Sequence, residues 1–167
     1  MTQKVLLADP KKCTGCGLCR VACALHHEGV CSPARSRVRV IQCGEAGPFL
    51  PVTCQHCESA PCASVCPVSA IGRDADNVRT VIDYNLCVGC RMCVYACPFG
   101  AMGFDADRGR PFKCDLCGGD PLCVQFCTPG ALTFADATAL GYRQLRTSAL
   151  MRSVAGGNRQ GPVCPDR

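Results

Sequence analysis

Residues 87–102 read CVGCRMCVYACPFGAM, and this stretch decides how the chain folds. Its four cysteines are spaced C-x2-C-x2-C-x3-C, and a proline follows the fourth directly. Gaps of two residues let one tight loop place three thiolates at three iron corners of a cubic [4Fe–4S] cluster, while the fourth thiol points to a neighbouring cluster. The stretch therefore predicts ligands for iron–sulfur clusters that lie close to one another.

The same four-cysteine unit occurs four times along the 167 residues and forms an internal repeat. The cysteines of the units are, in chain order, Cys13, Cys16, Cys19 and Cys23; Cys54, Cys57, Cys62 and Cys66; Cys87, Cys90, Cys93 and Cys97; and Cys114, Cys117, Cys123 and Cys127. The second and fourth units have middle gaps of four and five residues instead of two. Cys31, Cys43 and Cys164 stand outside the units. We predict that the units hold four [4Fe–4S] clusters.

The composition leaves little material for an ordinary hydrophobic core. Cysteine makes up 19 of the 167 residues and is counted in the apolar fraction of 48 %, while Trp is absent and Phe and Tyr number only 6 and 3. Metal clusters that act as the core account for this composition. Short stretches of β-strand character stand at residues 5–8, 37–42, 81–83, 101–104 and 131–134. We therefore expect an α+β fold, with small antiparallel sheets and short helices packed on the clusters.

Two other uses of cysteine fit the sequence less well. A disulfide scaffold requires an oxidising compartment, but the first twelve residues have no twin arginine and no apolar run longer than four residues, so we expect a cytoplasmic location. Structural zinc sites also use C-x2-C pairs, but they usually join two pairs across a longer gap. A zinc protein would be colourless, so an absorption spectrum of the anaerobic protein separates the two readings.

The charge and the remaining motifs bear on other function classes. The formal net charge of +5 counts every cysteine as neutral. Four oxidised clusters, each about −2 with its thiolates, would bring the protein to about −3, so we expect no binding to nucleic acid. No convincing helix-turn-helix segment supports a redox-sensing regulator. No phosphate-binding loop, nucleophile–base pair or incomplete cluster unit is present, so we expect no catalysis by the chain alone.

The chain resembles ferredoxin-type iron–sulfur proteins at residues 87–102 and at residues 54–71, CQHCESAPCASVCPVSAI. Over about residues 4–134, the order of the four units resembles the four-cluster electron-transfer subunits of molybdenum and tungsten oxidoreductases, formate dehydrogenases and hydrogenases. The resemblance implies two ferredoxin-like halves, each with two clusters, and a chain that relays single electrons between a larger catalytic subunit and another redox partner.

Local contexts support this resemblance, and two positions depart from it. The contexts are residues 55–57, QHC, and residues 113–117, KCDLC. Ser69 stands where the family usually has Gly, and Thr-Pro at residues 128–129 moves the last proline one place along. Neither departure removes a ligand, so both concern only the turns that follow the second and fourth units.

The resemblance also implies that each cluster takes three cysteines from one unit and one from another. The implied ligand sets are Cys54, Cys57, Cys62 with Cys97; Cys87, Cys90, Cys93 with Cys66; Cys13, Cys16, Cys19 with Cys127; and Cys114, Cys117, Cys123 with Cys23. The second and third units would form one half, about residues 54–104, and the first and fourth the other, about residues 1–53 plus 105–134. The hairpin-sized link between Cys66 and Cys87 agrees with this pairing. A tandem pairing, first unit with second and third with fourth, is the alternative.

The expected catalytic partner also rests on the resemblance. Our first choice is a tungsten or molybdenum pterin aldehyde oxidoreductase, partly because of the basic insertion at residues 27–40, HEGVCSPARSRVRV. A hydrogenase or formate dehydrogenase is the second choice. A flavin subunit and further copies of this chain are other expected partners, and no direct insertion into a membrane is expected.

Residues 135–167 form an extension that holds no cysteine of a unit. Residues 135–154 are rich in Ala, Leu and Arg and predict a helix. Residues 156–162, GGNRQGP, have the composition of a segment that is disordered when free. We expect the extension to contact another subunit, either the catalytic partner or a second copy, and packing on its own domain is the alternative.

Two groups of basic residues follow the first unit. His26 and His27 are expected to be structural, because no C-x-x-C-H haem motif occurs and four cysteines already fill each site. Arg35, Arg37 and Arg39 alternate with other residues, so on a strand they would share one face. Such a face is either solvated or docked to an acidic partner.

Two further basic residues stand beside cysteines of the units. Arg91 follows Cys90 directly, and Lys113 precedes Cys114. A positive charge there would raise the reduction potential of the local cluster. The alternative for both is a solvent-facing side chain with no effect on the cluster.

Overall fold

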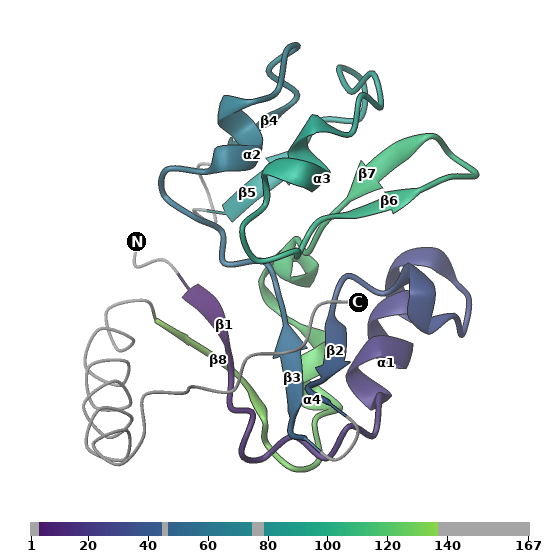
Figure 1. Cartoon of the computed structure of the whole chain (residues 1–167), viewed down its shortest axis with the longest axis vertical. Helices are drawn as coiled ribbons and strands as arrows, with labels where there is room; N and C mark the ends of the chain where they lie inside the picture. Colours follow the sequence, from purple (N-terminus) through teal and green to yellow (C-terminus); the bar gives the residue numbers. More distant parts are fainter. Residues whose placement is uncertain (1–3, 45–46, 75–78, 137–167) are drawn as a thin grey trace.

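The computed structural model describes residues 4–44, 47–74 and 79–136 (Figure 1). The strands are β1 (Lys4–Ala8), β2 (Arg39–Gln42), β3 (Phe49–Val52), β4 (Ile71–Asp74), β5 (Arg79–Ile82), β6 (Gly103–Asp105), β7 (Arg110–Phe112) and β8 (Leu132–Asp136). The helices are α1 (Leu18–Glu28), α2 (Pro61–Ser64), α3 (Met92–Ala96) and α4 (Leu122–Gln125), with single 3-10 turns η1 (Pro33–Arg35) and η2 (Leu116–Gly119). Small antiparallel sheets and few short helices were predicted, and both are confirmed.

Each described sheet is one antiparallel pair of strands. β2 pairs with β3, β4 with β5 and β6 with β7, so three pairs are consecutive in the chain. β1 pairs with β8 instead, from Lys4 opposite Asp136 to Ala8 opposite Leu132. This pair closes the region of the four units and places the first unit beside the fourth, while β4–β5 spans the link between the second and third units (Figure 1).

Each described helix begins within one cysteine unit, and the helices pack in pairs. α1 packs against α4, and α2 packs against α3. In Figure 1, α2, α3, β4 and β5 lie in the upper part of the molecule, while β1, β8, α1 and α4 lie in the lower part. The first and fourth units therefore share one region, and the second and third share the other.

Cysteines fill much of both buried regions. The lower region packs Leu6, Val38, Leu116 and Leu132 around Cys19, Cys23, Cys114 and Cys123. The upper region packs Ile71, Met102 and Cys93 against Cys62, Cys66 and Cys97. The scarcity of large apolar side chains in the sequence thus reappears as two small cores lined by thiols.

The sequence did not predict β3, β4 and β7, and the bounds of other strands differ from those predicted. β3 contains Pro51 and β7 contains Pro111, whereas β4 reads IGRD without alternating β-formers. Proline is tolerated because every strand of a two-stranded sheet has an edge that needs no N–H donor. The strand expected at residues 37–42 begins at Arg39, and those expected at residues 81–83 and 101–104 are Arg79–Ile82 and Gly103–Asp105.

The start of the predicted C-terminal helix was wrong. Ala135 and Asp136 belong to β8, where they lie opposite Val5 and Lys4, because β1 begins early enough to extend the ladder over them. The remainder of the predicted helix and tail lies outside the described residues. Within the described ranges, no helix has the length and apolar character needed to cross a membrane.

Candidate metal centres

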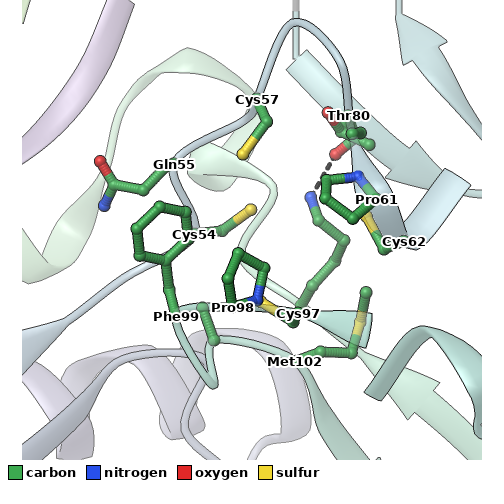
Figure 2. Close-up of a pocket in the computed structure, with 13 residues that line it drawn as sticks. Cys54, Gln55, Cys57, Pro61, Cys62, Thr80, Cys97, Pro98, Phe99 and Met102 are labelled. Atoms are coloured by element: carbon green, nitrogen blue, oxygen red, sulfur yellow. Dashed lines mark hydrogen bonds between the residues drawn. The ribbon is translucent and has the colours of Figure 1, made fainter. Parts of the chain in front are cut away.

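One cavity brings together four thiols from two units. Cys54, Cys57 and Cys62 of the second unit and Cys97 of the third line it, together with Met102 and other largely apolar side chains. Figure 2 shows the four sulfur atoms directed toward a common centre. We call this group of four cysteines the Cys54 site.

A second cavity repeats this arrangement in the lower region. It is lined by Cys13, Cys16 and Cys19 of the first unit and by Cys127 of the fourth. These four cysteines are the Cys13 site. Both cavities thus contain a combination of three plus one cysteines that the resemblance implies.

The remaining unit cysteines gather in two further groups. Burial raises the pKa of Cys123, and the thiols of Cys114, Cys23 and Cys117 next to it raise it further. We call these four cysteines the Cys114 site. The pKa of Cys93 is raised mainly by burial and further by the thiols of Cys90 and Cys87, which belong to the same unit. We call these three, with Cys66, the Cys87 site; Cys66 packs against the buried group that contains Cys93, as Cys62 and Cys97 also do, and the resemblance assigns it to this set. Of the other cysteines, Cys31 and Cys43 lie outside the four sites, and Cys164 is outside the described residues.

Neighbouring sites lie close enough for a thiol of one site to raise the pKa of a thiol of the next. The pKa of one thiol in each pair is raised first by burial and then, among other causes, by its partner thiol: Cys93 by Cys62, Cys114 by Cys54, and Cys123 by Cys19. These pairs give the order Cys87 site, Cys54 site, Cys114 site and Cys13 site.

The donor set fits an iron–sulfur cluster at each site. Burial raises the pKa of Cys19 and Cys93 to about 11 and that of Cys114 to about 12, mainly because it penalises the thiolate. The thiolate is the form that binds a metal, so a cationic group must compensate for this penalty. Soft sulfur ligands in this spacing suit iron–sulfur clusters.

Backbone N–H groups are already directed at several of these sulfur atoms. The amide of Ala70 donates to Cys66 Sγ at 3.2 Å, that of Arg37 to Cys23 at 3.3 Å, that of Leu132 to Cys127 at 3.3 Å, that of Leu116 to Cys114 at 3.4 Å and that of His56 to Cys54 at 3.5 Å. Hydrogen bonds to sulfur favour its anionic form and tune the potential of a bound cluster.

The four units share a backbone turn that the sequence repeat alone does not prescribe. The residue before the second cysteine of each unit is left-handed, with φ of 73° at Gly15, 46° at His56, 70° at Gly89 and 60° at Leu116. This conformation turns the loop so that successive thiols face one centre. The fourfold repeat is therefore present in the backbone even where the glycine is replaced.

A second turn follows the fourth cysteine of the second, third and fourth units. It is present in both units whose sequence departs from the family pattern at this point. Ser69, Gly100 and Gly130 are left-handed, and their amides donate to the carbonyl oxygens of Cys66, Cys97 and Cys127. The turn thus persists with Ser in place of Gly and with the proline shifted to residue 129.

Gly89 offers a test of this loop geometry. A Cβ added there would lie 2.2 Å from the carbonyl oxygen of Gly109, in addition to the strain of φ +70°. Gly17 is equally left-handed at +76° but has open space around it. We expect Gly17→Ala to cost about 1 kcal/mol and Gly89→Ala about 3 kcal/mol, measured anaerobically as the loss of the native fold in denaturant. Equal costs for the two variants would contradict the described contact.

His27 lies beside a cysteine of the fourth unit, although it follows the first unit in sequence. Its Nε2 atom is 3.6 Å from Cys117 Sγ and 3.4 Å from a carboxylate oxygen of Asp115. His26 is exposed and contacts His27 edge-on. The contacts agree with the structural role that the sequence suggested for His27.

The three arginines do not form the shared strand face that their spacing suggested. Arg35 ends η1 and pairs with Asp107, and Arg37 precedes β2 and pairs with Asp115 at 2.9 Å. Arg39 alone lies on β2, and it donates to the carbonyl oxygen of Met102 at 3.1 Å. Because β2 begins only at Arg39, the three arginines do not share a strand face. Each instead contacts an oxygen atom of this same chain.

His56 has a role that sequence reasoning missed. Its side chain is fully buried, and its Nδ1 accepts the Thr80 amide of β5 at 3.1 Å. Burial, together with nearby Lys113, lowers the pKa of His56 to about 3, so the ring is neutral. His56 thereby fastens the loop of the second unit to β5, and only the quoted context of residues 55–57 hinted at it.

Comparison with known proteins identifies the family. Residues 46–137 match the family described as "4Fe-4S dicluster domain", which covers more than half of the chain. The chain therefore belongs to this iron–sulfur family. The described sheets and thiol groups agree with that membership.

Several curated relatives are similar over most of their length. The polyferredoxin-like subunit of the aliphatic sulfonate oxidoreductase of Pyrococcus furiosus is 41 % identical over 122 residues, which cover 73 % of this chain and 70 % of the relative. The putative electron transport protein YsaA of Escherichia coli is 41 % identical over 157 residues, 86 % and 96 % of the two chains. The thiosulfate reductase electron transfer subunit PhsB of Salmonella typhi is 37 % identical over 145 residues, 79 % and 75 %.

A solved structure shares the fold. A chain of the active site complex BamBC of benzoyl coenzyme A reductase, as isolated, superposes with a TM-score of 0.50 at 26 % identity, covering 92 % of this chain and 98 % of that chain. The relatives are named as electron-transfer proteins or as subunits of oxidoreductases. This chain is accordingly an iron–sulfur electron-transfer protein and not the catalytic component.

Proposed function

We propose that the chain holds four [4Fe–4S] clusters, one at each of the four sites, and relays single electrons along them. When bound, the clusters supply the one-electron chemistry. The chain supplies sixteen thiolates, N–H groups aimed at sulfur, and a mostly buried environment. The three-plus-one sharing of cysteines between units ties each pair of clusters into one half, about residues 54–104 and about residues 1–53 plus 105–134.

The observation that carries the proposal is the linear order of the sites. Cys54 packs against the buried group that contains Cys19, Cys23, Cys114 and Cys123, and Cys62 packs against the group that contains Cys93. Thiols of successive sites therefore lie close enough for an electron to pass from one site to the next. Among the described unit cysteines, the exposed ones are Cys16 and Cys90, which belong to the two end sites. The ends are thus the points at which redox partners would exchange electrons.

The partners are proposed from the resemblance and the relatives. A catalytic subunit would dock at one end, with a tungsten or molybdenum pterin aldehyde oxidoreductase as first choice and a hydrogenase or formate dehydrogenase as second. The relatives named as sulfonate oxidoreductase and thiosulfate reductase subunits support a place in an oxidoreductase complex. We further propose a cytoplasmic location, a flavin subunit or second copy as other partners, and subunit contact through residues 137–167.

Anaerobic purification from native cells tests the proposal. We expect about sixteen iron and about sixteen sulfide per chain, because each cluster contributes four of each. A pterin, nickel or flavin protein should elute with the chain. Half of this iron, or zinc in its place, would refute the four-cluster assignment, and a chain that elutes alone would refute the role as a subunit.

A further inference from the structure

Lys113 occupies a buried position at the junction of the two halves. Its side chain is only 4 % exposed, and it lines the cavity of the Cys54 site although it directly precedes the fourth unit. Its ammonium group donates to the carbonyl oxygen of Cys114 at 2.8 Å and to that of Thr80 on β5. One cation therefore spans the Cys54 site in the upper region and the first cysteine of the Cys114 site in the lower region.

Lys113 shares its cavity with four thiols and has no carboxylate partner among the described residues. Within residues 4–44, 47–74 and 79–136, no carboxylate oxygen forms an ion pair with Lys113, and its two hydrogen-bond acceptors are neutral carbonyls. Asp115, the nearest acidic residue in sequence, is paired with Arg37 at 2.9 Å. A buried charge without a counter-charge is unfavourable, and an iron–sulfur cluster with four thiolates is an anion that would provide one.

The second basic residue beside a unit cysteine is placed differently. Arg91 is exposed, and its guanidinium lies over the ring of Phe104, 4.0 Å from the centroid. Water and salt screen an exposed charge, whereas a buried charge acts through a medium of low dielectric constant. From the sequence, Arg91 and Lys113 are equally placed to act on a cluster. Of these two, the structure buries Lys113 and exposes Arg91, so Lys113 acts more strongly.

We propose that Lys113 raises the reduction potential of the cluster at the Cys54 site above those of the two end clusters. Reduction adds one negative charge to the cluster, and the unscreened ammonium group stabilises that added charge. An electron entering from either end would then rest preferentially at the centre of the chain, next to the Cys114 site. This inference rests on the proposed four-cluster relay.

The test is a redox titration of the purified wild-type protein, followed by electron paramagnetic resonance. The signal of the Cys54 site is assigned by its change in Cys57→Ala. Lys113→Gln keeps a hydrogen-bond donor but removes the charge, Lys113→Arg keeps the charge, and Arg91→Gln is the matched exposed control. In Lys113→Gln we expect the ratio of reduced to oxidised cluster at a fixed potential to fall at least about tenfold at the Cys54 site, about 59 mV for one electron, with a smaller fall at the Cys114 site and none at the two end sites.

Each outcome of this titration decides the question. The proposal is supported by little change in Lys113→Arg and Arg91→Gln, together with a shift in Lys113→Gln that is largest at the Cys54 site and absent at the two end sites. An unshifted potential in a Lys113→Gln protein that keeps its full iron content overturns it, as does an equal shift at all sites. Loss of iron in Lys113→Gln would also overturn it, because the residue would then be structural. A wild-type chain without four clusters would instead refute the proposed function.

Discussion

Apoprotein prepared by removing the iron is expected to be unfolded over the whole region of the four units. The larger apolar side chains that the described structure buries are only Val5, Leu6, Val38, Ile71, Met102, Leu116 and Leu132. The helices other than α1 have four or five residues, too short to persist alone. Structural zinc in zinc-finger peptides contributes about 10–16 kcal/mol of folding free energy, as much as the whole stability of a typical domain at about 5–15 kcal/mol, and a cluster held by four thiolates couples to folding in the same way.

Circular dichroism and amide hydrogen exchange measure this loss of folded structure. The protein would be treated anaerobically with an iron chelator plus an oxidant, which together dismantle the clusters. Chelator without oxidant, if the iron content stays intact, is the control and should leave the spectrum unchanged. An iron-free chain that keeps native-like protection in β1 and β8 would contradict the view that clusters form the core.

A pair of cysteine substitutions is expected to reveal which units share a cluster. Cys16 and Cys127 line one cavity, although 110 residues of chain lie between them. Alanine offers no ligand atom, so Cys16→Ala and Cys127→Ala should each alter the same cluster signal. The double variant should lose no second cluster, because both changes act on one site and their effects are not additive.

The control pair gives the opposite pattern. The double variant Cys16→Ala and Cys66→Ala removes one ligand from the Cys13 site and one from the Cys87 site, so two cluster signals should change. Under the tandem pairing the outcomes are exchanged: Cys16 and Cys66 would share a cluster, and Cys16 and Cys127 would not. Iron content and electron paramagnetic resonance of the four variants therefore distinguish the two pairings in one experiment.

Much of the fold could be predicted because the decisive interactions are local. The two-residue gaps between cysteines, as in Cys87 to Cys93, require a tight loop whatever the rest of the chain does. The strand at residues 5–8 and that at residues 131–134 were predicted from their runs of apolar and β-branched residues, and both are present. The class of protein and its type of cofactor follow from the same local patterns.

The partner strands could not be predicted because tertiary pairing overrides local preference. β3 and β7 contain proline, and β4 contains Gly72 with charged residues after it. Each becomes a strand only because a better strand lies beside it, a few residues away in sequence. For the same reason β8 extends through Ala135 and Asp136, where composition alone predicted a helix.

The sequence by itself thus determined the number of cysteine units, the type of metal centre they suit and the small-sheet architecture, since all of these depend on spacing within a few residues. Only the tertiary structure decided which units meet, that Arg37 pairs with Asp115, and that Lys113 faces a site whose cysteines belong to other units. These relations depend on β1 pairing with β8 and on the path of the chain between the two halves. A buried charge acts on whatever lies nearest in space, and distance along the chain does not reveal it.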